Sequence, residues 1–319
     1  MKHRSFCLVP PAWPAVLVLA VGVIWASRDC QSAEDASDAR PALAFRPAGK
    51  EFLFDTGVLR GTLRAQGRSL GLTGVVDIAS GKAVAGAYGL VSHYRLLDAE
   101  ARYGTAAWDW PSQARLLADG GVEVRWPADA NHPFQMKATY RWADPHTVEV
   151  TTEVAPQRPL RRFEVFLASY FAGFPVSMVY ARPGPQAKPD FVTATKDRGV
   201  WLAFPRDDEA VRTIQDGRWQ RPPNPVQWVI MPRLAAPLAM RRDADSGLVA
   251  LLMAPPSDCF AICTPFGEEG HRSVYLSLFG RDIGAGQTAT ARARLVIARN
   301  LTSADAVRQY EAYVGQAAR

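Results

Sequence analysis

The feature that most constrains this chain is a repeated alternation of apolar and polar residues over short segments. It is clearest in residues 147–154, where valine alternates with threonine and glutamate. Period-two alternation rich in β-branched residues is typical of antiparallel strands with one face in water. Similar patterns occur in residues 122–126, 134–140, 272–279 and 288–298, and residues 247–253 read as a buried strand.

Turn signals separate these segments, for example Asp119-Gly120-Gly121 and Asp216-Gly217. The chain has 319 residues, of which 48% are hydrophobic, and this is enough to bury the core of one large β domain. We therefore predict an all-β fold in which about a dozen antiparallel strands form one large two-sheet sandwich.

A helical pattern is clear only near the C-terminus, in residues 303–314. Thr302 or Ser303 can cap this helix, and Val307, Tyr310 and Val314 share one face. We expect a short C-terminal helix that packs its apolar side onto the sheet edge.

The N-terminal segment has the order of a secretory signal peptide. Residues 2–4 are basic, residues 15–26 are one apolar run, and the small residues Ala26 and Ala33 offer cleavage sites. The apolar run is shorter than the ~20 residues that span a bilayer. We predict that residues 1–33 are a signal peptide and that the protein is periplasmic or secreted. An uncleaved membrane anchor is the alternative.

The remaining chain divides simply. Residues 34–49 begin with polar residues, are rich in Ala and Pro, and are predicted to be a flexible leader. Residues 50–319 are predicted to form a single β domain, without a membrane span. The Pro- and Gly-containing residues 183–190 are the best candidate for a break within it.

The cysteines are interpreted through the predicted export, because an exported protein meets an oxidising compartment. Cys259 and Cys263 are four residues apart, which is ~13 Å in an extended strand and too far for a disulfide. Prolines flank the pair, so a loop between strands is credible, and we expect a loop disulfide. The spacing alone is weak evidence for a zinc site.

Charge and motifs exclude several classes of partner. The chain has 37 Lys and Arg against 31 Asp and Glu, and no run of five basic residues, so nucleic acid is not an expected partner. The sequence has neither a dinucleotide-binding glycine fingerprint nor a phosphate loop. Its five histidines show no metal-ligand spacing. No cofactor and no metal are expected, and the oligomeric state is left open.

One region resembles a known family. The resemblance rests on residues 108–110, 119–126, 132–140 and 147–154, followed by the pair Tyr170-Phe171. In spacing and strand rhythm this order is similar to the galactose mutarotase-like (aldose 1-epimerase-like) family, over residues 50–180. The resemblance implies an all-β, large antiparallel two-sheet supersandwich, here with a short C-terminal helix. It also implies a concave sheet that faces carbohydrate, and we expect Tyr170 to contact the sugar.

The departures from that family concern its catalytic residues. Aldose epimerases place a histidine two residues before the Tyr-Phe pair, where this chain has Ala168. Tyr103-Gly104 stands where a His-Gly pair is expected, and no late motif carries a glutamate base. Ring opening of a sugar needs both a proton donor and a base. We therefore expect no epimerase activity.

The densest polar cluster is His93-Tyr94-Arg95. On a regular strand His93 and Arg95 face the same side, ~6.6 Å apart, and Arg102 follows soon after. Arginine binds carboxylate or sulfate through paired hydrogen bonds, so these residues are candidates for holding an anionic sugar. The alternative is a cluster of interstrand ion pairs, with Asp98, Glu100 and Asp109 as partners.

A second candidate is the proline-rich segment between Trp219 and Trp228, which Arg218 precedes. Aromatic rings held by a stiff loop can stack on sugar faces, and an arginine adds hydrogen bonds. We list Arg218, Trp219 and Trp228 as substrate-binding candidates. The alternative is that both tryptophans fill the sandwich.

Candidates for acid–base chemistry are few. Glu268-Glu269-Gly270-His271 brings carboxylates and a histidine next to a strand. His271, Glu269 and His93 are the catalytic candidates, and the alternative for the first two is a solvated turn.

These observations predict an exported carbohydrate-binding protein of mutarotase-like fold without epimerase activity, whose ligand is a carbohydrate, either neutral or acidic. The first alternative is a lyase or epimerase acting on acidic sugars through His93, Arg95 and a carboxylate. The second is a structural envelope protein with no small-molecule site. A deep cleft lined by Trp and Arg would favour the first two classes, and a filled concave face would favour the third.

Overall fold

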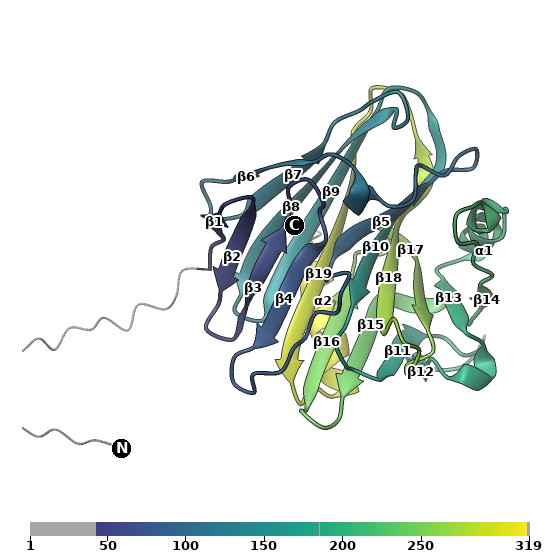
Figure 1. Ribbon diagram of the computed structural model, residues 1–319. Helices are drawn as coiled ribbons and strands as arrows, with labels where there is room; N and C mark the ends of the chain where they lie inside the picture. The colour runs from purple at the N-terminus through teal and green to yellow at the C-terminus, as the bar shows by residue number, and fades with distance from the viewer. Residues whose placement is uncertain (1–42, 185, 318–319) are drawn as a thin grey trace, which may run out of the picture. The chain divides into compact units, whose positions relative to one another are not determined.

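The computed structural model describes residues 43–184 and 186–317, and the predicted signal peptide, residues 1–33, lies outside them. The described residues form three sheets, in which every pair of strands is antiparallel except β13 and β14 (Figure 1). The predicted all-β class and the C-terminal helix are confirmed. The predicted pair of large sheets is present, and a smaller sheet is added at the N-terminal end.

The small sheet has the order β1-β2-β3-β4. Its strands are β1 (Arg46–Ala48), β2 (Glu51–Asp55), β3 (Leu59–Arg64) and β4 (Gly71–Asp77). The leader predicted over residues 34–49 is therefore wrong at its C-terminal end. Phe45 is buried, with its ring 5.9 Å from that of Phe54 and 6.1 Å from that of Trp142. These contacts bury an aromatic side chain, so ordered structure begins before residue 50.

The large sheet has the order β12-β11-β15-β16-β19-β9-β8-β7-β6. Its strands are β6 (Gln113–Leu116), β7 (Val122–Trp126), β8 (Phe134–Asp144), β9 (Thr147–Pro156), β11 (Val176–Ala181), β12 (Asp190–Thr193), β15 (Leu234–Asp243), β16 (Leu248–Met253) and β19 (Ala289–Arg299). The strands predicted from alternation at residues 122–126, 134–140, 147–154, 247–253 and 288–298 all fall here. They form the wall against which the main core packs.

The third sheet, called the site sheet below, has the order β14-β13-β17-β18-β10-β5. Its strands are β5 (Ser92–Leu97), β10 (Leu160–Tyr170), β13 (Trp201–Pro205), β14 (Val229–Ile230), β17 (Cys259–Pro265) and β18 (Ser273–Ile283). Its two faces differ. On β10, Val165 and Leu167 belong to the main core, whereas Phe166 and Ala168 belong to a separate apolar cluster on the opposite face. We call these the inner face and the outer face.

The described helices are α1 (Asp208–Ile214), α2 (Ser303–Ala317) and the short 3₁₀ turns η1 (Ala107–Asp109), η2 (Lys196–Arg198) and η3 (Arg218–Gln220). Thr302 caps α2, because its hydroxyl accepts a hydrogen bond from the backbone N–H of Asp305 at 3.1 Å. None of these helices is long and apolar enough to cross a membrane.

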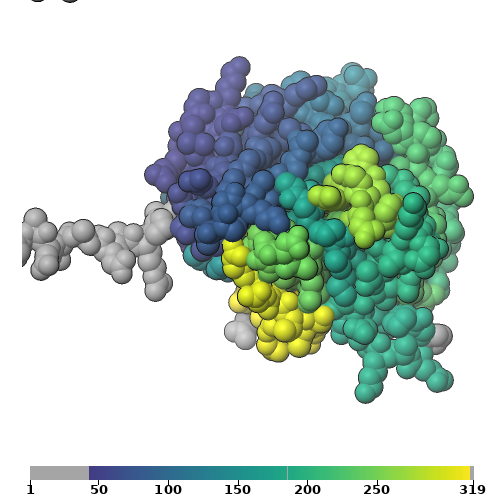
Figure 2. Space-filling view, turned by 60° about the horizontal axis from the view of Figure 1, so that its bottom comes forward, coloured from purple at the N-terminus to yellow at the C-terminus, as the bar shows by residue number. Residues whose placement is uncertain are grey.

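Helix α2 covers a sheet face, and the predicted packing on a sheet edge is wrong. Tyr310 and Tyr313 are buried against Leu238 and Leu251 of β15 and β16. Figure 2 shows α2 (yellow) next to the β15–β16 region (green) on one face of the molecule. The helix buries the side of the large sheet that faces away from the main core.

The predicted disulfide is also wrong. Cys259 and Cys263 are both free and buried, and both lie within strand β17, Cys259 as its first residue. Their partners across the sheet are Leu278 and Tyr275, so the segment is extended rather than curled. Extended residues four apart are beyond disulfide reach, and the flanking prolines lie at the strand's ends without bending it. Burial raises the pKa of both thiols, that of Cys259 to about 12.

Candidate functional site

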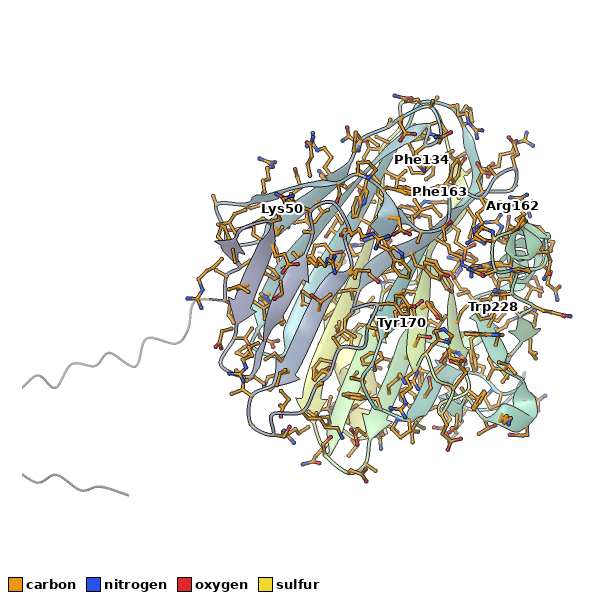
Figure 3. All side chains as sticks on the ribbon, in the orientation of Figure 1. Lys50, Phe134, Arg162, Phe163, Tyr170 and Trp228 are labelled. Atoms are coloured by element: carbon orange, nitrogen blue, oxygen red, sulfur yellow. The ribbon has the colours of Figure 1, made fainter. Side chains whose placement is uncertain are left out.

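The candidate site is a cavity of about 470 Å³ on the outer face of the site sheet. Its lining is largely aromatic, and it is built from β5, β10, β13, β18 and the loops that cover them. Tyr170 and Trp228, labelled in Figure 3, lie on this side of the sheet, while Phe134 and Phe163 pack in the main core. The volume is in the range of small-molecule sites.

One wall is a ladder of three rings. Tyr94 stacks on Trp108 with 4.5 Å between ring centroids and 8° between planes. Tyr88 stacks on Trp108 at 5.5 Å and 12°. Gly89 holds Tyr88 in place: it has φ +72°, and a Cβ there would lie 2.0 Å from the carbonyl oxygen of Leu70. Tyr88 is 47% exposed, so the ladder runs from the cavity towards solvent.

The floor and the opposite wall are a second aromatic group. Phe166 of β10 stacks on Tyr275 of β18 at 4.4 Å. The ring of Trp219 packs edge to face on Phe166, with 4.6 Å between ring centroids, and edge to face on Trp228, with 5.3 Å. The centroid of Trp201 lies 6.1 Å from that of Trp228. Such packed rings hold each other in fixed orientations, which makes a rigid wall.

A β-bulge in β5 decides which side chains reach the cavity. Leu96 pairs with Val165 and His93 pairs with Leu167, so two residues of β5 stand opposite the single residue Phe166. The extra residue places both Tyr94 and Arg95 on the outer face, where they line the cavity.

His93 consequently lies on the inner face, and its predicted role as a site residue is wrong. It is 1% exposed, its Nε2 is 2.9 Å from the Thr152 hydroxyl, and its Nδ1 is 3.4 Å from the Tyr140 hydroxyl. Burial lowers its pKa to about 3, so the ring is neutral at pH 7. This histidine is a hydrogen-bonded core residue.

Arg95, predicted to bind substrate, lines the cavity and is only 4% exposed. Its Nη2 donates to the Tyr94 hydroxyl at 3.1 Å. Its guanidinium carbon lies 5.0 Å from the ring centroid of Tyr94 and 5.2 Å from that of Trp219. Its Nε and Nη1 have no hydrogen-bond partner among the described residues. The side chain is thus held by aromatic rings, and it borders the cavity with two buried nitrogens that lack acceptors.

Arg102 does not line the cavity, so its predicted binding role is not supported. It donates to the backbone carbonyls of Arg221, at 3.1 Å, and of Pro223. Arg221 in turn donates to the carbonyls of Asp98 and Ala99, at 3.0 and 2.6 Å. These bonds fasten the proline-rich loop to the turn after β5. Arg102 therefore positions the loop that carries Trp228.

Arg218 was also predicted to bind substrate, but it is fully buried beside the cavity wall. It forms ion pairs with Asp216 at 2.9 Å and Glu164 at 3.4 Å, and it donates to the carbonyl of Arg162 at 2.7 Å. Burial raises the pKa of Glu164, against the opposing charge of Arg218. Arg218 fixes η3 to β10, and through η3 it fixes the orientation of Trp219.

His271 and Glu269 form a contact pair at the rim of the cavity. His271 lines the cavity, and its Nδ1 lies 2.9 Å from Oε1 of Glu269. Its ring is 6.3 Å from that of Tyr170 and 5.8 Å from that of Trp201. The two groups come from one turn and touch each other, so they do not face each other across bound ligand. Glu269 itself is not part of the lining.

Two tyrosine hydroxyls complete the polar part of the site. Tyr275 donates to the hydroxyl of Tyr170 at 3.4 Å, and Ser273 donates to the hydroxyl of Tyr275 at 2.7 Å. Burial raises the pKa of Tyr275 to about 12 and that of Tyr170 well above its ordinary value. Both hydroxyls stay protonated at neutral pH, so they act as hydrogen-bond donors and acceptors rather than bases.

Ala168 lies on the outer face, in the apolar cluster that borders the cavity, and it pairs with Tyr275. A methyl group therefore occupies the position at which the resemblance calls for a histidine. Among the described residues no group of three or more His, Cys, Asp or Glu side chains is arranged to hold a metal ion.

Several cavity residues were missed in the sequence. They are Tyr88, Trp201, Phe166 and Tyr275, together with Trp108 and Tyr94, which lay in segments singled out for other reasons. Single aromatic residues on alternating strands look like core residues. The period-two pattern does not tell whether the second face of a buried sheet meets another layer or a cavity.

Comparison with known proteins gives structural likenesses only. No family model and no curated protein sequence matches the chain. A galactose mutarotase related enzyme from Lactobacillus acidophilus is similar with 7% identity and a TM-score of 0.49, over 79% of this chain and 99% of that one. A putative aldose 1-epimerase from Escherichia coli has 12% identity and a TM-score of 0.40, over 80% and 98%.

An alpha-N-acetylgalactosaminidase from Bifidobacterium bifidum is similar with 12% identity and a TM-score of 0.49, over 85% of this chain and 38% of that one. The galactose mutarotase-like likeness indicated by the sequence is thus found again among solved structures. At these identities and TM-scores it says nothing about the reaction or the ligand of this chain.

Proposed function

We propose that this protein is an exported carbohydrate-binding protein that holds its ligand in the aromatic cavity of the site sheet and has no aldose epimerase activity. The observation that carries the proposal is the cavity's lining: flat aromatic rings on two sides and hydrogen-bond donors between them. Pyranose rings present apolar C–H faces and a polar hydroxyl edge, and this lining complements both.

The donors are placed as a sugar would require. Arg95 has unpartnered N–H groups, and Nε1 of Trp228 is also buried without a hydrogen-bond partner. Thr105 and Asn224 line the same cavity. A buried donor that lacks an acceptor costs about 1–3 kcal/mol, and a bound hydroxyl or carboxylate would remove that cost. Ligand binding would thus supply acceptors for these buried donors and remove the cost of leaving them without hydrogen bonds.

The proposed absence of epimerase activity rests on acid–base chemistry. The described lining includes no carboxylate, and Ala168 supplies no proton donor. The hydroxyls of Tyr170 and Tyr275 have raised pKa values and hold their protons. A base and an acid on opposite sides of the sugar are therefore missing from the cavity.

A lyase or epimerase of acidic sugars is the second candidate, and one observation favours it. His271 reaches the cavity rim with Glu269 as its hydrogen-bond partner. A histidine oriented by a carboxylate is a common general base. His93 takes no part in this second candidate, because its side chain lies on the inner face.

The experiment is a binding screen of the chain without residues 1–33 against neutral and acidic oligosaccharides, read by tryptophan fluorescence and confirmed by calorimetry. Trp228→Ala removes a wall of the cavity and should weaken affinity about tenfold or more. Trp142→Phe changes a core tryptophan and should leave affinity unchanged. Equal affinity in wild type and Trp228→Ala would move the site elsewhere. Turnover of an acidic sugar that is lost in His271→Gln would establish the enzyme instead.

A further inference from the structure

Arg95 is an unusual buried cation. It is 4% exposed, and Nε and both hydrogens of Nη1 lack acceptors, so at least three of its five N–H donors are unused. Its one side-chain acceptor is a neutral phenol, that of Tyr94. Buried charges in proteins are normally paired, because an unpaired one costs several kcal/mol in lost hydration.

The other two buried arginines among the described residues show what a structural role looks like. Arg241 donates to three backbone carbonyls, those of Phe174, Ser273 and Gly267. Arg218 has two carboxylates and a carbonyl as acceptors. No ion pair among the described residues includes Arg95, and the cavity lining offers it no carboxylate. Arg95 is therefore placed and stiffened by Tyr94 and Trp219 without being neutralised.

A second arginine lies near Arg95. Burial, and then the charge of Arg95, lowers the pKa of Arg102 to about 10, which places the two guanidinium groups within electrostatic reach of each other. The carboxylate of Glu269 contacts His271 at the rim and is not part of the lining. The two arginines therefore favour an anion over a cation at the Arg95 end of the cavity.

We propose that Arg95 is the receptor for an anionic group, a carboxylate or a sulfate ester, on the sugar bound in this cavity. The inference rests on the proposed function, and it narrows the ligand from carbohydrates in general to acidic ones. The anion takes the free N–H donors of Arg95 in charge-assisted hydrogen bonds, and the sugar ring that carries it lies against the nearby aromatic rings. Further sugar units follow the ladder from Trp108 to Tyr88 towards solvent.

The ring ladder and Arg95 give different selectivities. Stacking acts on any pyranose face, whereas an unpaired guanidinium discriminates by charge. A neutral oligosaccharide should therefore bind weakly, since it leaves the buried cation uncompensated.

The test compares sets of three oligosaccharides that differ only at C6: the neutral sugar, the same sugar oxidised to the uronate, and the same sugar sulfated. Calorimetry is done at constant ionic strength with wild type, Arg95→Gln, Arg95→Lys and Arg95→Met. Arg141→Gln, which removes an exposed arginine paired with Asp119, is the control for net charge. The uronate and sulfate arms identify which anion is preferred.

Wild type should bind an acidic member about 10- to 100-fold more tightly than its neutral partner. Arg95→Gln should abolish that preference, Arg95→Lys should restore part of it, and Arg141→Gln should keep it. Arg95→Met should retain or raise the melting temperature, because it removes an unpaired buried charge. A structural arginine would instead lower the melting temperature on substitution and leave the preference for acidic sugars intact.

Equal binding of neutral and acidic members by wild type would overturn the inference and leave the proposed carbohydrate binding standing. Binding of acetate or inorganic sulfate that depends on Arg95, without binding of any oligosaccharide, would overturn the proposed function and support the anion receptor. Absence of all binding would overturn both.

Discussion

The two faces of the site sheet use the same strands for different purposes. On the inner face the polar groups of His93 have partners in Thr152 and Tyr140, and apolar side chains fill the space between the sheets. On the outer face Arg95 and Trp228 keep donors without partners beside a cavity. Nε1 of Trp142 in the main core also lacks a partner, so an unmet donor alone does not mark a ligand face. An unpaired guanidinium beside a cavity distinguishes the outer face, because a buried charge without acceptors is costly.

The contrast also shows how a shift of one residue in strand register decides which side chain enters the core and which lines the cavity. His93 and Arg95 are two positions apart and would share a face on a regular strand. The β-bulge lies between His93 and Leu96, and because of it the histidine side chain is on the inner face and the arginine side chain on the outer face. The arginine's neighbour Tyr94 is carried out with it and becomes part of the ring ladder.

The largest expected effect is on the ion pairs that support the outer face. Arg218→Met leaves the buried carboxylate of Glu164 without its cation and Asp216 with Arg162 alone, and it should lower the free energy of unfolding by about 3–5 kcal/mol. Arg141→Met breaks an exposed pair and should cost at most about 1 kcal/mol. Urea denaturation of both variants measures the difference. Equal losses would mean that the buried network does not support the wall.

The next effect sharpens the account of the inner face. His93 is held neutral by burial, with a pKa of about 3, against about 6.5 in an unfolded chain. Between these pH values the unfolded state binds more protons, so the free energy of unfolding should fall as pH decreases, by up to about 1.4 kcal/mol per pH unit. Above pH 6.5 the histidine is neutral in both states, so the folded state keeps its full stability there.

The control for that pH dependence is a matched substitution. His93→Gln should lose about 1–3 kcal/mol at pH 7 through its hydrogen bonds and should show a flatter stability curve between pH 6.5 and pH 4. His271→Gln, at an exposed position, should leave the stability at pH 7 unchanged. The interpretation of His93 fails if His93→Gln keeps the wild-type slope.

A smaller effect is expected at the open end of the ladder. Tyr88→Ala removes a half-exposed stacking ring and should weaken the binding of longer oligosaccharides by about 2- to 10-fold, which corresponds to about 0.5–1.5 kcal/mol. Binding of a single sugar unit should be unchanged. Calorimetry with a chain-length series checks this, and an equal loss at every length would place Tyr88 in the first sugar's contact surface.

No effect is expected from reducing agent. Cys259 and Cys263 are free and buried in β17, so dithiothreitol should not shift the melting temperature. Both thiols should react with a thiol reagent only after denaturation, because burial keeps them protonated and covered. Alkylation in denaturant without reductant should add two groups to the chain without residues 1–33, as counted by mass spectrometry. A chain that takes up neither group would support the disulfide instead.

Much of the fold was predictable because alternation reports burial directly. The strand predicted over residues 122–126 has those bounds in the structure, and the helix from Ser303 begins where its capping residue predicts. Helix α1 was missed, although Asp207 caps it by accepting from the N–H of Ala210. The seven residues of that helix are too few to show a helical period.

The site was less predictable, for two physical reasons. A bulge shifts side chains by one residue without leaving a strong local signal, and this moved His93 out of the site. Arginines differ by their acceptors, which come from distant segments: Arg102 meets carbonyls more than a hundred residues away, and Arg218 meets Glu164. The sequence named Arg95 as one of several candidates, and only the structure shows that it differs from Arg102 and Arg218 in lacking acceptors for its Nε and Nη1.

The most direct test of the difference between the two faces uses the indole N–H signals of the tryptophans. Trp108, Trp201, Trp219 and Trp228 line the cavity, whereas Trp110, Trp126 and Trp142 belong to the main core. The measurement is a nitrogen-15 NMR titration of the chain without residues 1–33 with an oligosaccharide uronate. We predict saturable shifts of the cavity indoles, largest at Trp228, and fixed positions for the core indoles. Shifts confined to the core indoles, or none at saturating uronate, would contradict carbohydrate binding on the outer face.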